Sequence, residues 1–183
     1  MTFEEMLLRR ESCRAFSDRP VSRDDLMKLV EAGRLSPSAC NAQPWKFIIV
    51  DDPEAKKKLC DALVLDNGVT GVPFREQVPA FIIFVEQPAK VMRMVIDHYG
   101  DSQRFAQGDI GMAALNMCYQ AMDLGLSTCM LGLNNQGKME EAFGIPHGSE
   151  VRLVLAVGYS AKELPPRRKI RKSVEDVCSF NHW

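Results

Sequence analysis

Short runs of apolar residues stand out at three places along the chain. Residues 45–50 and 80–85 are almost wholly apolar, and residues 151–157 repeat the pattern. Runs of this kind between turn-forming segments predict strands that are buried on both faces. Residues 128–131 are also apolar, but this run is short and we assign it to no element. The pattern therefore predicts three buried strands.

Apolar residues spaced three and four positions apart predict helices between these strands. Each expected helix has a capping residue at its start or a glycine or proline at its end: residues 2–7, 22–35, 52–63, 110–121 and 136–143. Ser22 and Asp52 are expected N-caps, and Gly125 and Gly144 are expected to end the last two helices. Residues 90–108 have a weaker pattern and are expected to be partly helical. This mixture indicates an α+β or α/β protein.

The length of the chain favours a single domain. It has 183 residues, and domains cluster at about 100–150 residues. We find no internal repeat and no low-complexity tract. Residues 159–183 differ from the rest in their clustered basic residues and terminal aromatic residues. We expect them to form a C-terminal extension, which needs another surface to pack on.

The charge balance argues against several classes of protein. The chain has 23 basic and 24 acidic residues and a pI of about 6.3, unlike a dedicated nucleic-acid binder. Its longest apolar stretch, residues 78–85, is far shorter than the about 20 residues of a membrane span. The N-terminus lacks the residue order of a signal peptide, so we expect a soluble, cytoplasmic protein. The six cysteines lack metal-binding spacing, and no metal site is expected.

Three polar segments are candidates for chemistry, and each also has an ordinary interpretation. Residues 9–14 alternate arginines with a serine and suit a phosphate, although a solvated helix end would look the same. Residues 167–172 contain five basic side chains. These suit a phosphate monoester, but also a localisation signal, a solvated surface or a contact with nucleic acid. Residues 37–45 hold two prolines and small polar groups, which suit a ring edge as well as a simple turn.

The order and spacing of these segments resemble the nitroreductase family of FMN-dependent oxidoreductases. Residues 10–14 match the family's opening Arg-x-Ser-x-Arg/Lys motif, and residues 37–45 match its Pro-Ser-x-x-Asn-x-Gln-Pro-Trp motif. Residues 109–111, at the start of the long apolar helix, and residues 171–177 in the tail also match. The resemblance spans nearly the whole chain.

The resemblance implies a fold and an assembly. Proteins of this family have a three-layer α+β fold, with a mostly antiparallel central sheet flanked by helices, and they form intertwined homodimers. Residues 1–183 would form one such domain, and residues 159–183 would wrap around the partner subunit. Two identical FMN sites would lie at the dimer interface.

The resemblance also implies which residues bind the phosphate and ribityl end of FMN. Arg10 and Ser12 would hold this end, and Lys169 and Arg171 would join them from the tail. If the tail is shifted by one residue, Arg168 takes the place of Lys169.

The flavin ring would contact residues from both subunits. Arg14 would lie near N1 and O2, where negative charge appears on reduction. The main chain of three consecutive residues would face N5 and O4: Met130, Leu131 and Gly132. The partner subunit would supply four residues of its proline-containing loop: Pro37, Ser38, Ala39 and Asn41.

The implied activity passes electrons from NAD(P)H through flavin N5 to nitroaromatics, quinones or similar electron-poor acceptors by a ping-pong mechanism. Flavin N5 carries the chemistry, so no side chain is expected to be catalytic. The expected partners are a second copy of the chain, NAD(P)H and a small substrate, without nucleic acid or membrane. Residues 90–108 occupy the place where relatives carry a helical excursion over the substrate channel. The alternative is an FMN storage or delivery protein with little turnover.

Overall fold

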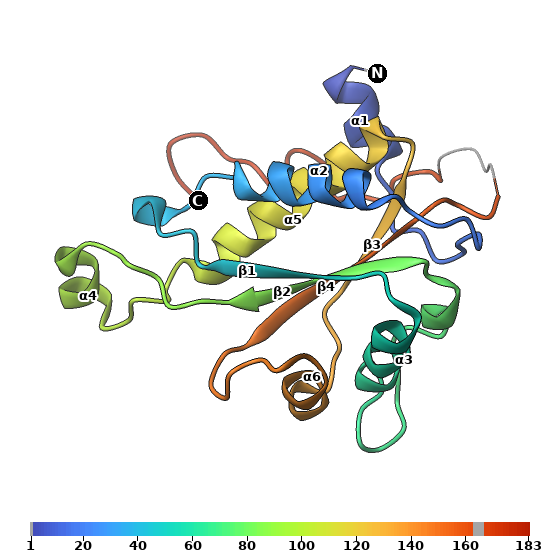
Figure 1. Ribbon diagram of the computed structural model, residues 1–183. Helices are drawn as coiled ribbons and strands as arrows, with labels where there is room; N and C mark the ends of the chain where they lie inside the picture. The colour runs from blue at the N-terminus through green and yellow to red at the C-terminus, as the bar shows by residue number, and fades with distance from the viewer. Residues whose placement is uncertain (1, 163–166) are drawn as a thin grey trace.

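A four-stranded antiparallel sheet forms the middle layer of the computed structural model, which describes residues 2–162 and 167–183 (Figure 1). Its strands lie in the order β1 (Trp45–Val50), β2 (Ala80–Glu86), β4 (Val151–Gly158) and β3 (Ser127–Leu131). The edge strands are therefore β1 and β3. The structure confirms the three expected strands and adds β3, whose apolar run is too short for the sequence pattern to identify.

Helices cover both faces of this sheet (Figure 1). One face packs against α2 (Arg23–Arg34) and α5 (Ala106–Asp123), and the other against α3 (Pro53–Ala62) and α6 (Gln136–Phe143). The expected three-layer α+β architecture is confirmed. The remaining helices are short and peripheral: α1 (Phe3–Arg9), α4 (Arg93–Tyr99) and the 3-10 turns η1 (Ala39–Asn41) and η2 (Arg75–Gln77). Within the described part of the chain, every helix is too short or too polar to span a bilayer.

The strands are apolar on both faces because helices cover the sheet on both sides. In β2, Phe81 and Ile83 face the α3–α6 layer, whereas Ile82 and Phe84 face the α2–α5 layer. All four side chains are fully buried. Burying a side chain of this size contributes about 1.5–3 kcal/mol of stability. Because its buried side chains enter both layers, β2 joins the two halves of the core.

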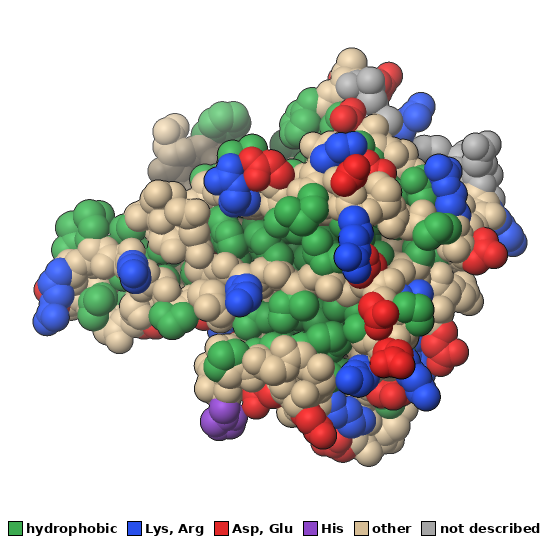
Figure 2. Space-filling view, in the orientation of Figure 1, with side chains coloured by type: hydrophobic (Ala, Val, Ile, Leu, Met, Phe, Trp, Pro, Cys, Tyr) green, Lys and Arg blue, Asp and Glu red, His purple; other side chains and the backbone are tan. Residues whose placement is uncertain are grey.

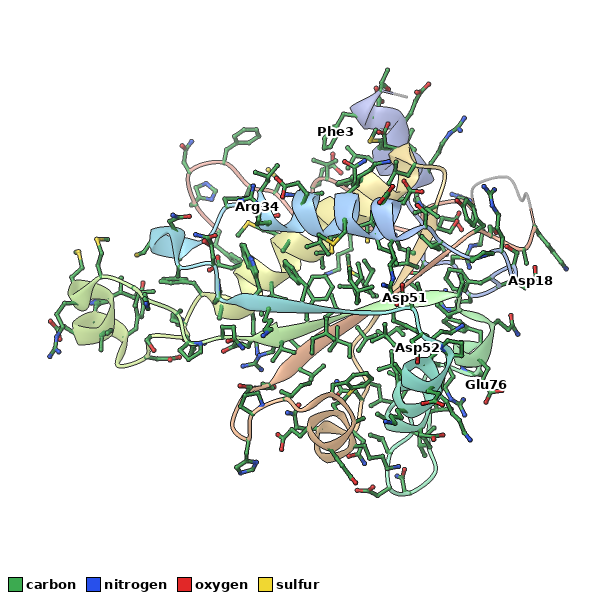
Figure 3. All side chains as sticks on the ribbon, in the orientation of Figure 1. Phe3, Asp18, Arg34, Asp51, Asp52 and Glu76 are labelled. Carbon is green, nitrogen blue, oxygen red and sulfur yellow. The ribbon has the colours of Figure 1, made fainter. Side chains whose placement is uncertain are left out.

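Side-chain caps set the helix boundaries as the sequence predicts. Ser22 Oγ accepts a hydrogen bond from the Asp25 N–H at the start of α2. Asp52 accepts from two N–H groups in the first turn of α3 (Figure 3). Gly144 ends α6 with a φ of 60°, which glycine adopts without strain.

The structure confirms that residues 90–108 are partly helical, although their weak pattern does not give the bounds of the helices. The helix α4 occupies seven residues of this segment. The long helix α5 begins at Ala106 rather than at Ile110. The sequence pattern does not reveal this first turn, because the exposed Gln107 and Gly108 interrupt the apolar stripe of the helix. The weak pattern therefore hides one complete helix and the first turn of another.

Phe16 fixes the polypeptide that follows α1 against the sheet. Its ring is buried and lies 6.1 Å from the ring of Phe74. Phe16 also pairs with Ser160, just beyond β4. Gly158 makes room for this contact, since a Cβ there would lie 2.5 Å from Pro79 Cγ and 2.9 Å from Phe16 Cδ1. These contacts hold the N-terminal segment beside the start of the C-terminal extension.

Candidate functional site

The arginine-rich segment after α1 lies along the edge of the sheet. Arg10 is the C-cap of α1. Ser12 pairs in parallel with Thr128 on β3, and the Cys13 N–H donates to the Thr128 carbonyl over 2.9 Å. Because β3 is an edge strand, its outer side has main-chain groups free for this pairing. The sheet edge thus fixes the backbone between Arg10 and Arg14.

The basic tail segment lies beside this arginine-rich segment. Arg167 donates to the Glu11 carboxylate from its main-chain N–H and from its guanidinium, whose Nε lies 2.8 Å from Oε2. The same guanidinium donates to the Ser12 carbonyl over 3.3 Å. Lys169 Nζ donates to the Arg10 carbonyl over 2.5 Å. Two segments from opposite ends of the sequence therefore meet at one place.

Positive charges surround Lys169. Removal from water lowers the pKa of Lys169, and the charges of Arg10 and Arg171 lower it further. Glu11 acts in the opposite direction, but its hydrogen bonds with Arg167 already hold the pKa of Glu11 below its usual range. We call Arg10, Lys169 and Arg171 the cation cluster. Because Glu11 is engaged by Arg167, the cation cluster keeps an excess of positive charge that suits an anion.

Arg14 lies near Cys129, the middle residue of β3. Burial raises the pKa of the Cys129 thiol, and the positive charge of Arg14 partly opposes this shift. The next residue, Met130, is 37% exposed, and the Cβ position of Gly132 is open. Leu131, by contrast, is buried and anchors the strand end in the core. Met130 and Gly132 are therefore accessible in the neighbourhood of Arg14.

The loop that contains the Pro-Ser and Gln-Pro motifs has a strained backbone. Cys40, Asn41 and Gln43 have φ angles of 54°, 52° and 47°. This left-handed region costs a residue other than glycine about 1–3 kcal/mol, and such residues cluster at functional sites. The Gln43 N–H donates to Ser38 Oγ over 3.0 Å, and Gln43 Nε2 donates to Asn41 Oδ1 over 3.2 Å. Ser38 and Asn41 therefore help to hold the loop in its strained shape.

Asp109 joins this loop to the start of α5. Its side chain is buried, and both carboxylate oxygens lie 3.2 Å from the Ala39 nitrogen, whose N–H donates to them. Burial raises the pKa of Asp109, although this hydrogen bond partly opposes the shift. Further along α5, Asn116 Nδ2 donates to Ser36 Oγ over 2.7 Å. The loop is thus fixed to α5 at two points.

A single chain does not bring this loop to the cation cluster. Asp109 holds the loop near the first turn of α5, whereas Thr128, the partner of Ser12, donates from its hydroxyl to Cys118. At 1.5 Å per residue, Asp109 and Cys118 are separated by about 13 Å along the helix. Figure 1 shows η1 and the segment after α1 on opposite sides of the molecule. The predicted residues 37–41 and the predicted phosphate-binding residues therefore lie apart in one subunit.

Apolar side chains are exposed on α1 and on the tail. No residue of α1 is buried, and Phe3 is 65% exposed although its ring lies 5.7 Å from that of Tyr119 (Figure 3). Phe180 and Trp183 in the tail are also exposed. Across the described residues, the hydrogen bonds of side chains from Arg171 onward stay within the tail. Exposed apolar surface of this extent is typical of segments that pack on another molecule.

Two residues that shape these sites were not identified as site residues by the sequence. Asp109 gives a signal, because an acid stands inside an otherwise apolar helical stripe. Glu11 gives none, because its partner Arg167 is 156 residues away. Among residues 2–162 and 167–183, no group of His, Cys, Asp and Glu side chains is arranged to hold a metal ion.

We predict that Asp109→Asn changes how stability depends on pH. Because folding raises the pKa of Asp109 above 3.8, the wild-type protein should lose stability relative to the variant as pH rises from that value through the raised pKa. The asparagine oxygen still accepts from the Ala39 N–H. Urea unfolding between acidic and neutral pH measures the difference.

Asp109→Ala is the control, because it also removes the hydrogen bond to Ala39. This variant should be less stable than Asp109→Asn by about 1–3 kcal/mol at every pH. A wild-type curve that stays parallel to that of Asp109→Asn would contradict the assignment of a buried ionising carboxyl group.

Known proteins are similar to this chain in sequence and in fold. Residues 7–159 match the Nitroreductase family. The chain is similar to the "Putative NADH dehydrogenase/NAD(P)H nitroreductase" of Archaeoglobus fulgidus, with 31% identity over 163 residues, 87% of this chain and 86% of that protein. It is also similar to two solved structures from Clostridium difficile. A nitroreductase family protein of strain 630 has a TM-score of 0.82 at 24% identity over 100% of both chains. An FMN-dependent nitroreductase of strain R20291 has a TM-score of 0.76 at 24% identity over 97% of this chain and 98% of that one. The chain therefore belongs to the nitroreductase family.

Proposed function

We propose that this protein is an FMN-dependent oxidoreductase that passes electrons from NAD(P)H to nitroaromatics, quinones or similar electron-poor acceptors. The observation that carries the proposal is the cation cluster, which the fold assembles from both ends of the chain. Membership of the nitroreductase family supports it. So do the names of two relatives, one an NAD(P)H nitroreductase and the other FMN-dependent.

The cation cluster fits the phosphate of FMN. A phosphate monoester carries nearly two negative charges at neutral pH, and guanidinium groups such as those of Arg10 and Arg171 can bind it with two hydrogen bonds each. Removal from water, followed by the charges of Arg10 and Arg171, lowers the pKa of Lys169, and a bound anion would offset both effects. We assign the phosphate to Lys169 rather than Arg168, because the Lys169 ammonium group contacts the Arg10 carbonyl. The Ser12 hydroxyl would bind the ribityl end.

We place the flavin ring beside Arg14 and residues 130–132. Bound FMN supplies the hydride and electron transfer. The fixed charge of Arg14 would stabilise negative charge at N1 and O2, and main-chain N–H groups of Met130, Leu131 and Gly132 would orient the N5 and O4 edge. Donor and acceptor would stack in turn on the same open face, which gives a ping-pong mechanism. The residues of the chain thus bind and orient, and they transfer no proton.

We further propose that the functional unit is a homodimer. Asp109 holds the strained loop at the first turn of α5, too far from the cation cluster of the same chain for the loop to reach it. The loop residues concerned are Pro37, Ser38, Ala39 and Asn41. The corresponding loop of a second copy would complete the site. Residues 159–183 would extend the single domain around that copy and bury the apolar side chains of the tail. The six free cysteines fit a reducing cytoplasm, where we place the protein.

The purified protein should be yellow and retain FMN. Anaerobic NADH or NADPH should bleach the flavin absorbance, and a nitroaromatic or quinone should restore it within the turnover time. A protein that binds FMN but bleaches slowly with either nicotinamide would instead indicate FMN storage or delivery. A protein that takes up no FMN would contradict the proposal.

Arg10→Ala and Arg14→Ala should each weaken FMN binding far more than Lys172→Ala. Arg10→Ala would remove a donor from the charged phosphate, which costs about 2–5 kcal/mol, and Arg14→Ala would remove a donor from the N1 and O2 edge of the ring. An exposed lysine contributes little. Lys172→Ala is matched in charge and lies in the exposed tail. Flavin fluorescence titration gives the three dissociation constants, and equal values would contradict the assigned site.

Dilution of the protein to monomer should weaken FMN binding. The reason is that loop residues 37–41 would come from the partner subunit. Sedimentation velocity identifies the concentration at which the dimer dissociates, and flavin titrations above and below it measure the affinity. An affinity that is independent of protein concentration across this range would show that one chain holds the cofactor alone.

A further inference from the structure

Residues 88–102 form an arm between β2 and α5. The arm contains α4, and none of its residues is buried. Figure 1 shows α4 projecting beyond the ends of β1 and β2, away from the two helical layers. A segment without buried side chains contributes no core packing to hold its own position. Its placement therefore comes from polar contacts at its base, together with the contacts of the Tyr99 ring with Phe105 and Arg104.

The side chain of Gln103 closes the base of the arm. Its Nε2 donates to Glu86 Oε1 over 2.6 Å and to the Gln87 carbonyl over 3.1 Å. Its Oε1 accepts from the Ala89 N–H over 2.5 Å. The Gln103 amide thus joins the end of the arm to Glu86 and Gln87, which precede the arm, and to Ala89 at its start.

Glu86 connects this closure to the sheet. It is the last residue of β2 and is only 7% exposed. Its second carboxylate oxygen accepts from Arg152 on β4, whose guanidinium also pairs with Glu150 over 2.5 Å. A carboxylate held in this way is a rigid acceptor, because its charge is compensated on the sheet itself. The arm is therefore anchored to the sheet through one carboxylate and one amide.

The base of the arm also touches the strained loop. The Gln87 N–H donates to the Pro44 carbonyl over 3.1 Å, so the arm and the loop of residues 37–44 share one edge of the molecule. Met92, Met94 and Tyr99 on the arm are 57%, 68% and 47% exposed. Figure 2 shows hydrophobic side chains on the projecting part of the molecule that α4 forms. Methionine side chains adapt to ligands of different shape.

We infer that Gln103 is a positioning residue, a clamp that fixes the methionine-bearing arm at the rim of the site where the electron acceptor binds. This inference rests on the proposed function and on the proposed homodimer, because the strained loop beside the arm would border the face of the flavin held by the partner subunit's cation cluster. The clamp acts through the arm and touches no reacting atom. We expect that loss of the Gln103 amide frees the arm and weakens binding of the electron acceptor, while FMN binding is retained.

The test compares Gln103→Met with Gln87→Met in the FMN-loaded protein. Methionine keeps the length and volume of glutamine but cannot make its hydrogen bonds. Gln87 is a matched control at the base of the same arm, since its side chain donates only to the adjacent Glu86 carbonyl. The main-chain groups of Gln87 that hold the arm are unchanged by the substitution.

Limited digestion with trypsin measures the freedom of the arm. Lys90 and Arg93 are exposed cleavage sites within it. Losing three hydrogen bonds, one of them to a carboxylate, should raise cleavage there roughly tenfold in Gln103→Met, because cleavage follows the population of open arm. Cleavage after Arg168 in the tail serves as an internal control and should not change. Equal arm cleavage in Gln103→Met, Gln87→Met and wild type would overturn the clamp.

Steady-state kinetics measure the consequence for the acceptor. In Gln103→Met the KM for a flat aromatic acceptor should rise at least threefold, with kcat within about twofold of wild type and FMN retention unchanged. A freed arm with an unchanged KM would overturn the positioning role. If the wild-type protein binds FMN but has no turnover, the proposed function fails, and the positioning role fails with it. The digestion then still decides whether the clamp exists.

Discussion

The contact of Lys169 with Arg10 is the interaction on which the candidate site depends. The Lys169 ammonium group donates to the Arg10 carbonyl, and Arg167 beside it pairs with Glu11. Pairing of Ser12 with Thr128 holds the receiving segment on the edge of the sheet. Removal from water, together with the charges of Arg10 and Arg171, lowers the pKa of Lys169. Contacts within the chain thus bring together positive charges that an anion would complement.

Contacts within the chain likewise hold the strained loop, near the start of α5. Left-handed backbone at Asn41 and Gln43 is unfavourable in isolation, and Asp109 holds the loop in place from a buried position. Ionising that carboxyl group is itself unfavourable there. The core of the chain therefore supports two preformed segments at different places along α5. In the homodimer that we propose, one such segment from each chain would complete a site.

Local signals predicted the local structure well. Ser22, Asp52 and Gly144 set helix boundaries through hydrogen bonds or φ angles that depend on neighbouring residues alone. β3 was missed because its five residues are recognisable only through their pairing with β4. The candidate site needed the family resemblance, since the contact of Lys169 with Arg10 joins residues 159 positions apart. The resemblance suggested that these residues act together, and the structure shows the contact of the Lys169 ammonium group with the Arg10 carbonyl.

The contact between the tail and the segment after α1 has a consequence for how the cation cluster responds to unfolding. Arg167 lies 156 positions from Glu11, and Lys169 lies 159 positions from Arg10. Closing so long a loop of chain costs conformational entropy, and the buried core between the two segments offsets that cost. The cation cluster therefore exists only while the core is folded, so an anion bound there would stabilise the folded chain against unfolding.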